Sequence, residues 1–160
     1  MADETKLEES HELEAEVLAH QIDGIMFHVD AVLLYKLIGM PKMMRIHMRH
    51  VAEESDNNLM TSCHLIGKYG EIIEPAKVSR DTDLTELKYA PMETHTDKAV
   101  INQKIIQAWH EWENDTKALY EDAVKEQPDC KLWSQLHKDV EKELRQVEYM
   151  KNKYLTAKAD

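Results

Sequence analysis

The pattern of apolar and polar residues along the chain predicts four long helices. Apolar side chains recur at intervals of three and four residues in four segments, which is the spacing of one face of an α-helix. The predicted helices run from about 12 to 38, from 41 to about 67 or 70, from 97 to 127 and from 130 to 156. A charged segment, residues 1–11, precedes them and a short tail, residues 157–160, follows. We therefore expect a single all-α domain over residues 12–156.

The connections between these segments predict how the helices are arranged. Gly39-Met40-Pro41 interrupts the first long segment, since glycine suits a helix end and proline a helix start. So short a connection makes the first two helices antiparallel. Residues 71–96 lack periodicity and are long enough to run the length of a bundle, which needs at least about 12 extended residues. The expected fold is a four-helix bundle with a long crossover between its second and third helices.

The first predicted helix carries two non-polar flanks. The flank interpreted as the core face consists of Leu18, Ile22, Ile25, Val29, Val32 and Leu33. The second, mixed flank consists of His20, Gly24, Phe27, Ala31 and, at its margin, His28. Two such flanks on one helix predict that one faces the bundle and the other faces another subunit.

The second predicted helix also has two stripes. The apolar stripe, interpreted as the packing face, consists of Met44, Met48, Val51, Ala52, Leu59 and Ile66. His47, His50 and Glu54 lie within about 60° of one another on the helix and are interpreted as lying off the packing face. Imidazoles with a carboxylate suit Fe(II), Zn(II) or Mn(II), so this stripe is the main chemical lead.

Charge and composition exclude several classes of function. The net charge is -11, and the first 16 residues hold seven acids and one lysine, which opposes binding to nucleic acid.

No phosphate-binding glycine loop and no nucleophile elbow is present, so hydrolase and kinase functions have no support. Cys63 and Cys130 lie on separate segments without C-x-x-C spacing, which favours free thiols. Neither a signal sequence nor a long uninterrupted apolar run is apparent, so we expect a cytoplasmic protein without a membrane span.

Several of these features resemble the ferritin-like superfamily. They are the Gly-x-Pro break, the glycine-ended second helix (LIGKYG) and the segment WENDTKALYEDAVKEQPDCKLWSQLHKDVEKELRQVEYM, which is similar to the second half of bacterioferritins and of Dps proteins. The resemblance covers nearly the whole chain. It implies a ferritin-like bundle that binds iron, oxidises it and stores it in a hollow oligomer.

The two groups of relatives place their iron differently. The bacterioferritin pattern, with E-x-x-H on the second and fourth helices, falls here on Glu54 with Asn57 and on Val140 with Glu143. Since most ligands are missing, we expect a nearly apolar interior, with Glu143 hydrogen-bonded rather than bound to metal. His110, Glu111 and Glu113 of the third helix are interpreted as a solvated face.

The Dps pattern implies a site between subunits on the outer flanks of the first two helices. Here it would use His20, Asp23, His47, His50 and Glu54. Two features depart from that pattern, because LMTSCHL lacks the expected downstream acids and Val29, not tryptophan, follows His28.

Two hypotheses of different classes follow. The first is a dimer-based, cage-forming homo-oligomer that binds iron, or else zinc or manganese, with weak ferroxidase activity. The alternative is a metal-free helical bundle with a structural or partner-binding role, which the apolar interior favours.

Overall fold

The computed structural model describes residues 11–77, 84 and 97–155. Within these residues the chain forms four α-helices and no strand. The helices are α2 (Glu12–Ile38), α3 (Pro41–Tyr69), α5 (Lys98–Glu126) and α6 (Lys131–Leu155). The prediction of an all-α fold with four long helices is confirmed.

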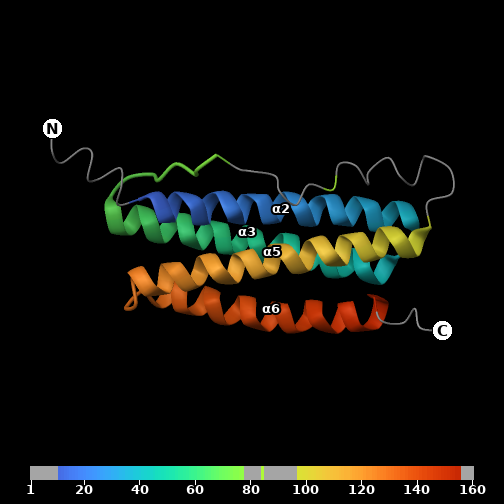
Figure 1. Ribbon diagram of the computed structural model, residues 1–160. Coiled ribbons are helices and arrows are strands. Elements are labelled where there is room, and N and C mark those ends of the chain that lie inside the picture. Colours follow the sequence, from blue (N-terminus) through green and yellow to red (C-terminus); the bar gives the residue numbers. More distant parts are fainter. Residues whose placement is uncertain (1–10, 78–83, 85–96, 156–160) are drawn as a thin grey trace.

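The helices form two antiparallel pairs, α2 with α3 and α5 with α6, which lie side by side (Figure 1). Helix α3 ends at one end of the bundle and α5 begins at the other, so their connection has to pass along the bundle. Two described points of this connection contact the helices. The Ala76 N–H donates to the Ala15 carbonyl oxygen at 2.9 Å, and Leu84 is buried among core side chains.

Local signals fix the helix ends as the sequence predicts. Gly39 adopts a left-handed conformation with φ of 73°, and the following Met40 N–H donates to the Tyr35 carbonyl oxygen at 2.9 Å. Pro41 is the first residue of α3. At the start of α5, the Asp97 side chain accepts a hydrogen bond from the Ala99 N–H at 2.9 Å.

The apolar core is divided into two clusters along the bundle. One cluster lies where α2 ends and α3 begins, and includes Phe27, Leu34, Tyr35, Met43, Ile105 and Trp109. The other lies toward the opposite end and includes Val17, Leu18, Leu65, Tyr120, Trp133 and Leu136. Buried polar and ionisable side chains lie between them. The prediction of a nearly apolar interior is therefore wrong.

Helix α2 buries the flank that the sequence assigned to another subunit. Phe27, His28 and Ala31 are fully buried, whereas Val29 and Leu33 of the predicted core face are 41% and 50% exposed. Gly24 explains part of this choice, because a Cβ atom there would lie 2.1 Å from Cζ2 of Trp112. The absence of a side chain at residue 24 lets the indole of α5 pack against α2.

Helix α3 is also turned relative to the prediction. Met48, Leu59 and Ile66 of the predicted packing stripe are 44% to 63% exposed. The face that packs into the bundle consists of Met43, His47, His50, Glu54, Thr61 and Leu65. In α5 and α6 the apolar residues at helical spacing are buried, among them Ile101, Ile105, Trp109, Trp112, Ala123, Leu136, Val140, Val147 and Met150.

One helix among the described residues, α2, is long and apolar enough by length and composition to cross a membrane. In the bundle, 61% of its most apolar stretch is buried against other helices. Core helices of soluble bundles meet the same criterion, so this property does not distinguish the two environments.

Candidate metal centre

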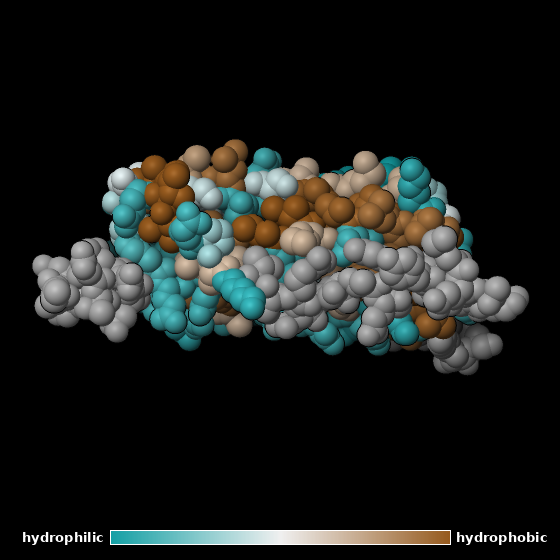
Figure 2. All heavy atoms as spheres, turned by 90° about the horizontal axis from the view of Figure 1, so that it is seen from above, coloured by the Kyte–Doolittle hydropathy of each residue, from teal (hydrophilic) through white to brown (hydrophobic). Residues whose placement is uncertain are grey.

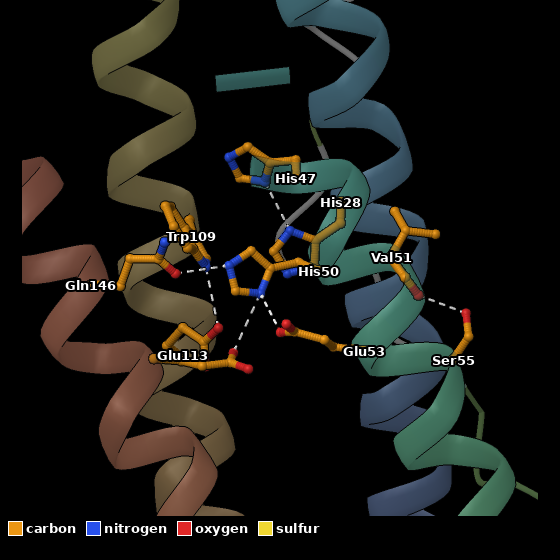
Figure 3. Close-up of polar contacts among 10 residues, drawn as sticks. His28, His47, His50, Val51, Glu53, Ser55, Trp109, Glu113 and Gln146 are labelled. Atoms are coloured by element: carbon orange, nitrogen blue, oxygen red, sulfur yellow. Dashed lines mark hydrogen bonds and ion pairs between the residues drawn. The ribbon is translucent and has the colours of Figure 1, made fainter. Parts of the chain in front are cut away.

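All four helices contribute polar side chains to the layer between the apolar clusters. These are His28 of α2; His47, His50, Glu53 and Glu54 of α3; Glu113 of α5; and Glu143 and Gln146 of α6. Figure 3 shows the three imidazoles together in the middle of the bundle, with carboxylates beside His50. Side chains spaced by three and four residues share one helix face, which is how α3 brings in His47, His50 and Glu54 together.

The imidazole of His50 is held in one orientation by α6. Its Nε2 lies 3.1 Å from the Oε1 atom of Gln146, and because a carbonyl oxygen only accepts, Nε2 carries the hydrogen. In the neutral ring the lone pair is then on Nδ1. That atom is buried and has no hydrogen-bond partner. A histidine fixed in this way by a second residue is the usual arrangement of a metal ligand.

Two carboxylates face this Nδ1 atom. It lies 3.5 Å from Glu53 Oε2 and 3.6 Å from Glu143 Oε2, and the three ligand atoms lie within 4.8 Å of one another. Neighbouring ligands of a first-row ion held at about 2.1 Å are separated by about 3.0 Å in octahedral and about 3.4 Å in tetrahedral geometry. The two distances from His50 Nδ1 are close to the tetrahedral value, so a divalent ion would need only a small movement of the Glu53 and Glu143 side chains to bind all three.

Two further carboxyl groups, Glu54 and Glu113, are almost completely buried beside this group. Burial raises the pKa of Glu54 well above its usual value, and Glu143 and Glu53 raise it further by charge repulsion. Burial also raises the pKa of Glu113, with added repulsion from Glu143 and Glu54. One oxygen of each, Glu54 Oε2 and Glu113 Oε2, has no hydrogen-bond partner. Burial of this kind favours the protonated carboxyl group, whereas a bound cation would favour the ionised form.

Glu113 is tied to two neighbours. Its Oε1 accepts a hydrogen bond from the Trp109 indole N–H at 3.1 Å, and it also hydrogen-bonds to Glu143. A hydrogen bond between two carboxyl groups requires that one of them be protonated. Burial raises the pKa of Glu143 as well, although Glu113 and His50 oppose that rise. Protonation of one of the two carboxyl groups would satisfy this contact when no metal is bound.

His28 and His47 form a second buried pair. Their Nδ1 atoms lie 2.9 Å apart, so one of them donates to the other, and the Nε2 atoms of both lack partners. Burial, followed by repulsion from His50, lowers the pKa of His47 to about 3. Burial and the other two imidazoles also lower the pKa of His28. The pair is therefore uncharged at neutral pH. Only the ring that donates keeps a free lone pair, on its Nε2, because the accepting ring carries its hydrogen on Nε2.

The structure separates the five sequence-predicted ligands. His47, His50 and Glu54 come together, but inside one chain, so the prediction that they lie off the packing face and at a subunit interface is wrong. They are 0%, 3% and 3% exposed. His20 instead lies 2.6 Å from Thr116 Oγ1 and stacks on Trp112, and Asp23 is buried elsewhere on α2.

Sequence reasoning missed Glu53, Glu113 and Glu143 as candidate ligands. Glu113 is fully buried, so its interpretation as part of a solvated face is wrong. The available signal was the spacing of Glu143 and Gln146, which places both on one face of α6 opposite His50. That signal becomes useful only if α3 presents its histidines inward.

Both cysteines are free, with Cys63 exposed and Cys130 half-buried. The Cys130 thiol lies 3.5 Å from His64 Nε2, at the end of the bundle where α6 begins. Neither belongs to the polar layer.

Comparison of the chain with known protein families, with characterised proteins and with solved structures gave no match in any of the three.

Proposed function

We propose that the chain is a ferritin-like metalloprotein that binds divalent iron at His50, Glu53 and Glu143 inside the bundle. The observation that carries this proposal is the His50 Nδ1 atom, buried without a hydrogen-bond partner and facing two carboxylates. A lone pair and two anionic oxygens repel one another until a proton or a cation lies between them. Two carboxylates with an imidazole suit Fe(II), and also Zn(II) and Mn(II). The arrangement of two antiparallel helix pairs joined by a long connection supports the ferritin-like assignment.

The number of carboxylates in the layer is enough to bind a second ion beside the first. Glu53, Glu54, Glu113 and Glu143 carry four negative charges when ionised, which two divalent cations neutralise. Glu54 and Glu113 each retain an unpartnered oxygen for this purpose. Two ions also suit the redox chemistry, because hydrogen peroxide takes one electron from each of two Fe(II) ions, takes up two protons and leaves as two water molecules. Protons displaced from Glu54 and Glu113 by the metal are available for that step.

Titration with Fe(II) under anaerobic conditions, followed by addition of peroxide, tests this function. We expect the wild type to bind up to two ions per chain and to oxidise them. The triple variant His50→Gln, Glu53→Gln, Glu143→Gln, which nearly preserves side-chain volume, should lose both properties. His137→Gln, which changes a half-buried histidine of α6 outside the layer, is the matched control. Equal binding by the wild type and the triple variant would exclude this site.

One observation favours the alternative of a metal-free structural bundle. The pairs Glu113 with Glu143 and His28 with His47 are hydrogen-bonded without any ion. Metal analysis of protein purified without added metal separates the two functions. Less than about one-tenth equivalent per chain, together with no uptake on titration, would favour the structural role.

Self-association is supported by an exposed apolar flank on the outer side of α2 and α3. It includes Val29, Leu33, Leu37, Met48, Leu59 and Ile66. Figure 2 shows hydrophobic residues gathered over one face of the molecule. A substantial apolar patch on a monomer is uncommon, and burial against a second copy would remove it from water. Light scattering of the wild type and of Leu33→Glu tests this, with a smaller particle expected for the variant. A monomeric wild type would exclude a cage.

A further inference from the structure

A cleft of about 760 Å³ lies between α3 and α6 and reaches the proposed metal ligands. Every residue that lines it belongs to one of these two helices, and His50, Glu53 and Glu143 are among them. Its volume is far larger than a metal ion requires. A hydrated ion therefore has room to approach with its water molecules still bound.

The three proposed ligands differ in how far they are exposed. The side chain of Glu53 is 43% exposed, that of Glu143 is 15% exposed and that of His50 is 3% exposed. The three therefore form a series from solvent to the interior. An ion that arrives from the cleft meets Glu53 first and His50 last.

The two ends of the bundle are closed to the layer by apolar side chains. One end of the bundle is filled by the cluster that contains Phe27, Met43 and Ile105, and the other end by the cluster that contains Leu65, Trp133 and Leu136. Moving an ion through such a layer carries a large desolvation cost. The cleft, in contrast with the two ends, keeps polar groups in contact with the ion.

The charges of the cleft favour cations. Its lining holds four carboxylates, of Glu53, Asp56, Asp139 and Glu143, against the two cationic side chains of Arg49 and Lys142. Asp139 accepts a hydrogen bond from the Gln135 amide at 2.9 Å, which holds its carboxylate in place. A cleft lined mainly by one sign of charge raises the local concentration of the opposite ion.

We infer that divalent ions reach and leave the bundle interior through this cleft, with Glu53 as the first protein ligand and Asp56 and Asp139 as steering charges. The inference rests on the proposed metal function and adds the route and the order of ligation. The ion first exchanges a water molecule for a Glu53 oxygen, and then gains Glu143 and the Nδ1 atom of His50.

Stopped-flow measurement of Co(II) binding and release tests the route. Asn57→Trp places a bulky side chain on the cleft wall one helical turn beyond Glu53, so it should slow both steps at least tenfold and leave the equilibrium Kd within twofold. Ser55→Trp is the matched control, because Ser55 lies on the flank of α3 that faces away from the group (Figure 3). Met60→Trp, at an exposed lining position, provides a second block if the first variant does not fold.

The role of the steering charges is tested separately, by the salt dependence of the Co(II) binding rate. The double variant Asp56→Asn, Asp139→Asn should bind Co(II) about two- to fivefold more slowly at low salt, and high salt should remove the difference. Asp122→Asn, an exposed acid of α5 outside the cleft, should bind at the wild-type rate.

The outcomes separate the route from the site. Absence of Co(II) binding to the wild type overturns both the proposed function and the route. Normal equilibrium binding with wild-type rates in both tryptophan variants overturns the route alone, as does a salt-independent effect of the two aspartates.

Discussion

The Nε2–H of His50 donates to the side-chain carbonyl oxygen of Gln146 across the α3 and α6 interface, at 3.1 Å. This bond decides which nitrogen of His50 is free, and it aims Nδ1 at Glu53 and Glu143. An apolar residue at 146 would leave the imidazole free to rotate or to change tautomer. Gln146 is therefore a positioning residue for the proposed metal site.

Replacing Gln146 by leucine should weaken metal binding. The expected loss is about 10- to 100-fold in affinity for Co(II) or Zn(II), the range found when the residue that orients a metal-binding histidine is removed. Isothermal titration calorimetry measures it. Gln107→Leu, an exposed position on α5, should bind with wild-type affinity. Unchanged affinity in Gln146→Leu would show that His50 does not need this partner.

Metal affinity should rise with pH. Burial raises the pKa values of Glu54, Glu113 and Glu143, so these groups hold protons in the metal-free protein at pH values where free carboxylates do not. A divalent ion must displace those protons, which makes binding weaker as pH falls and stronger as pH rises toward the raised pKa values. Calorimetry in buffers of different ionisation enthalpy counts the protons released.

Glu113→Gln provides the variant for that measurement. It removes one displaceable proton and should flatten the dependence of affinity on pH. Equal proton release by the wild type and the variant would place the displaced protons on other groups.

The two halves of the chain differ in how well the sequence predicts which side chains are buried. In α5 and α6, large apolar residues such as Trp109, Leu136 and Val147 lie on one face, and the periodicity identifies it. In α2 both flanks are apolar, so periodicity does not decide between Val29 and Phe27. Which flank of α2 is buried depends on how closely it fits a neighbouring helix, as where Trp112 of α5 packs on Gly24. The apolar pattern of one helix holds no information about that contact.

The candidate site was difficult to predict for a related reason. Histidine and glutamate are normally expected on the solvated side of a helix, so the sequence predicts that His47, His50 and Glu54 lie off the packing face. The burial of His47 and His50 is compensated by partners on other helices, which are His28, Gln146 and Glu143. Those partners are distant in sequence, and their pairing with α3 depends on how that helix is rotated in the bundle.

His20 should make the metal-free protein less stable in mild acid. Burial lowers the pKa of His20 to about 4, from 6.5 in the unfolded chain. The unfolded state therefore takes up a proton below pH 6.5 that the folded state takes up only near pH 4, so stability falls as pH drops through this window. The contribution reaches up to about 2 kcal/mol at pH 5.

A comparison of His20→Gln with the wild type isolates this contribution. Urea unfolding at pH 7 and pH 5, in the presence of a chelator, gives the change in stability for each protein. The change should be smaller for His20→Gln by up to about 2 kcal/mol, because the variant lacks this titrating group. Equal changes in the two proteins would mean that His20 is protonated in the folded state at pH 5.

Gly24→Ala should destabilise the fold although alanine favours helices. A Cβ atom at residue 24 would lie 2.1 Å from Cζ2, 2.6 Å from Cη2 and 2.8 Å from Cε2 of Trp112, and that indole is fully buried and stacked on His20. Overpacking of this kind costs about 1–3 kcal/mol, which exceeds the gain of about 0.5–1 kcal/mol from replacing glycine in a helix. Gly67→Ala in α3 is the matched control, because no atom lies within 4 Å of its added Cβ. Thermal unfolding should therefore show a lower Tm for Gly24→Ala and a slightly higher Tm for Gly67→Ala. A rise in both would mean that Trp112 can move away from α2 at little cost.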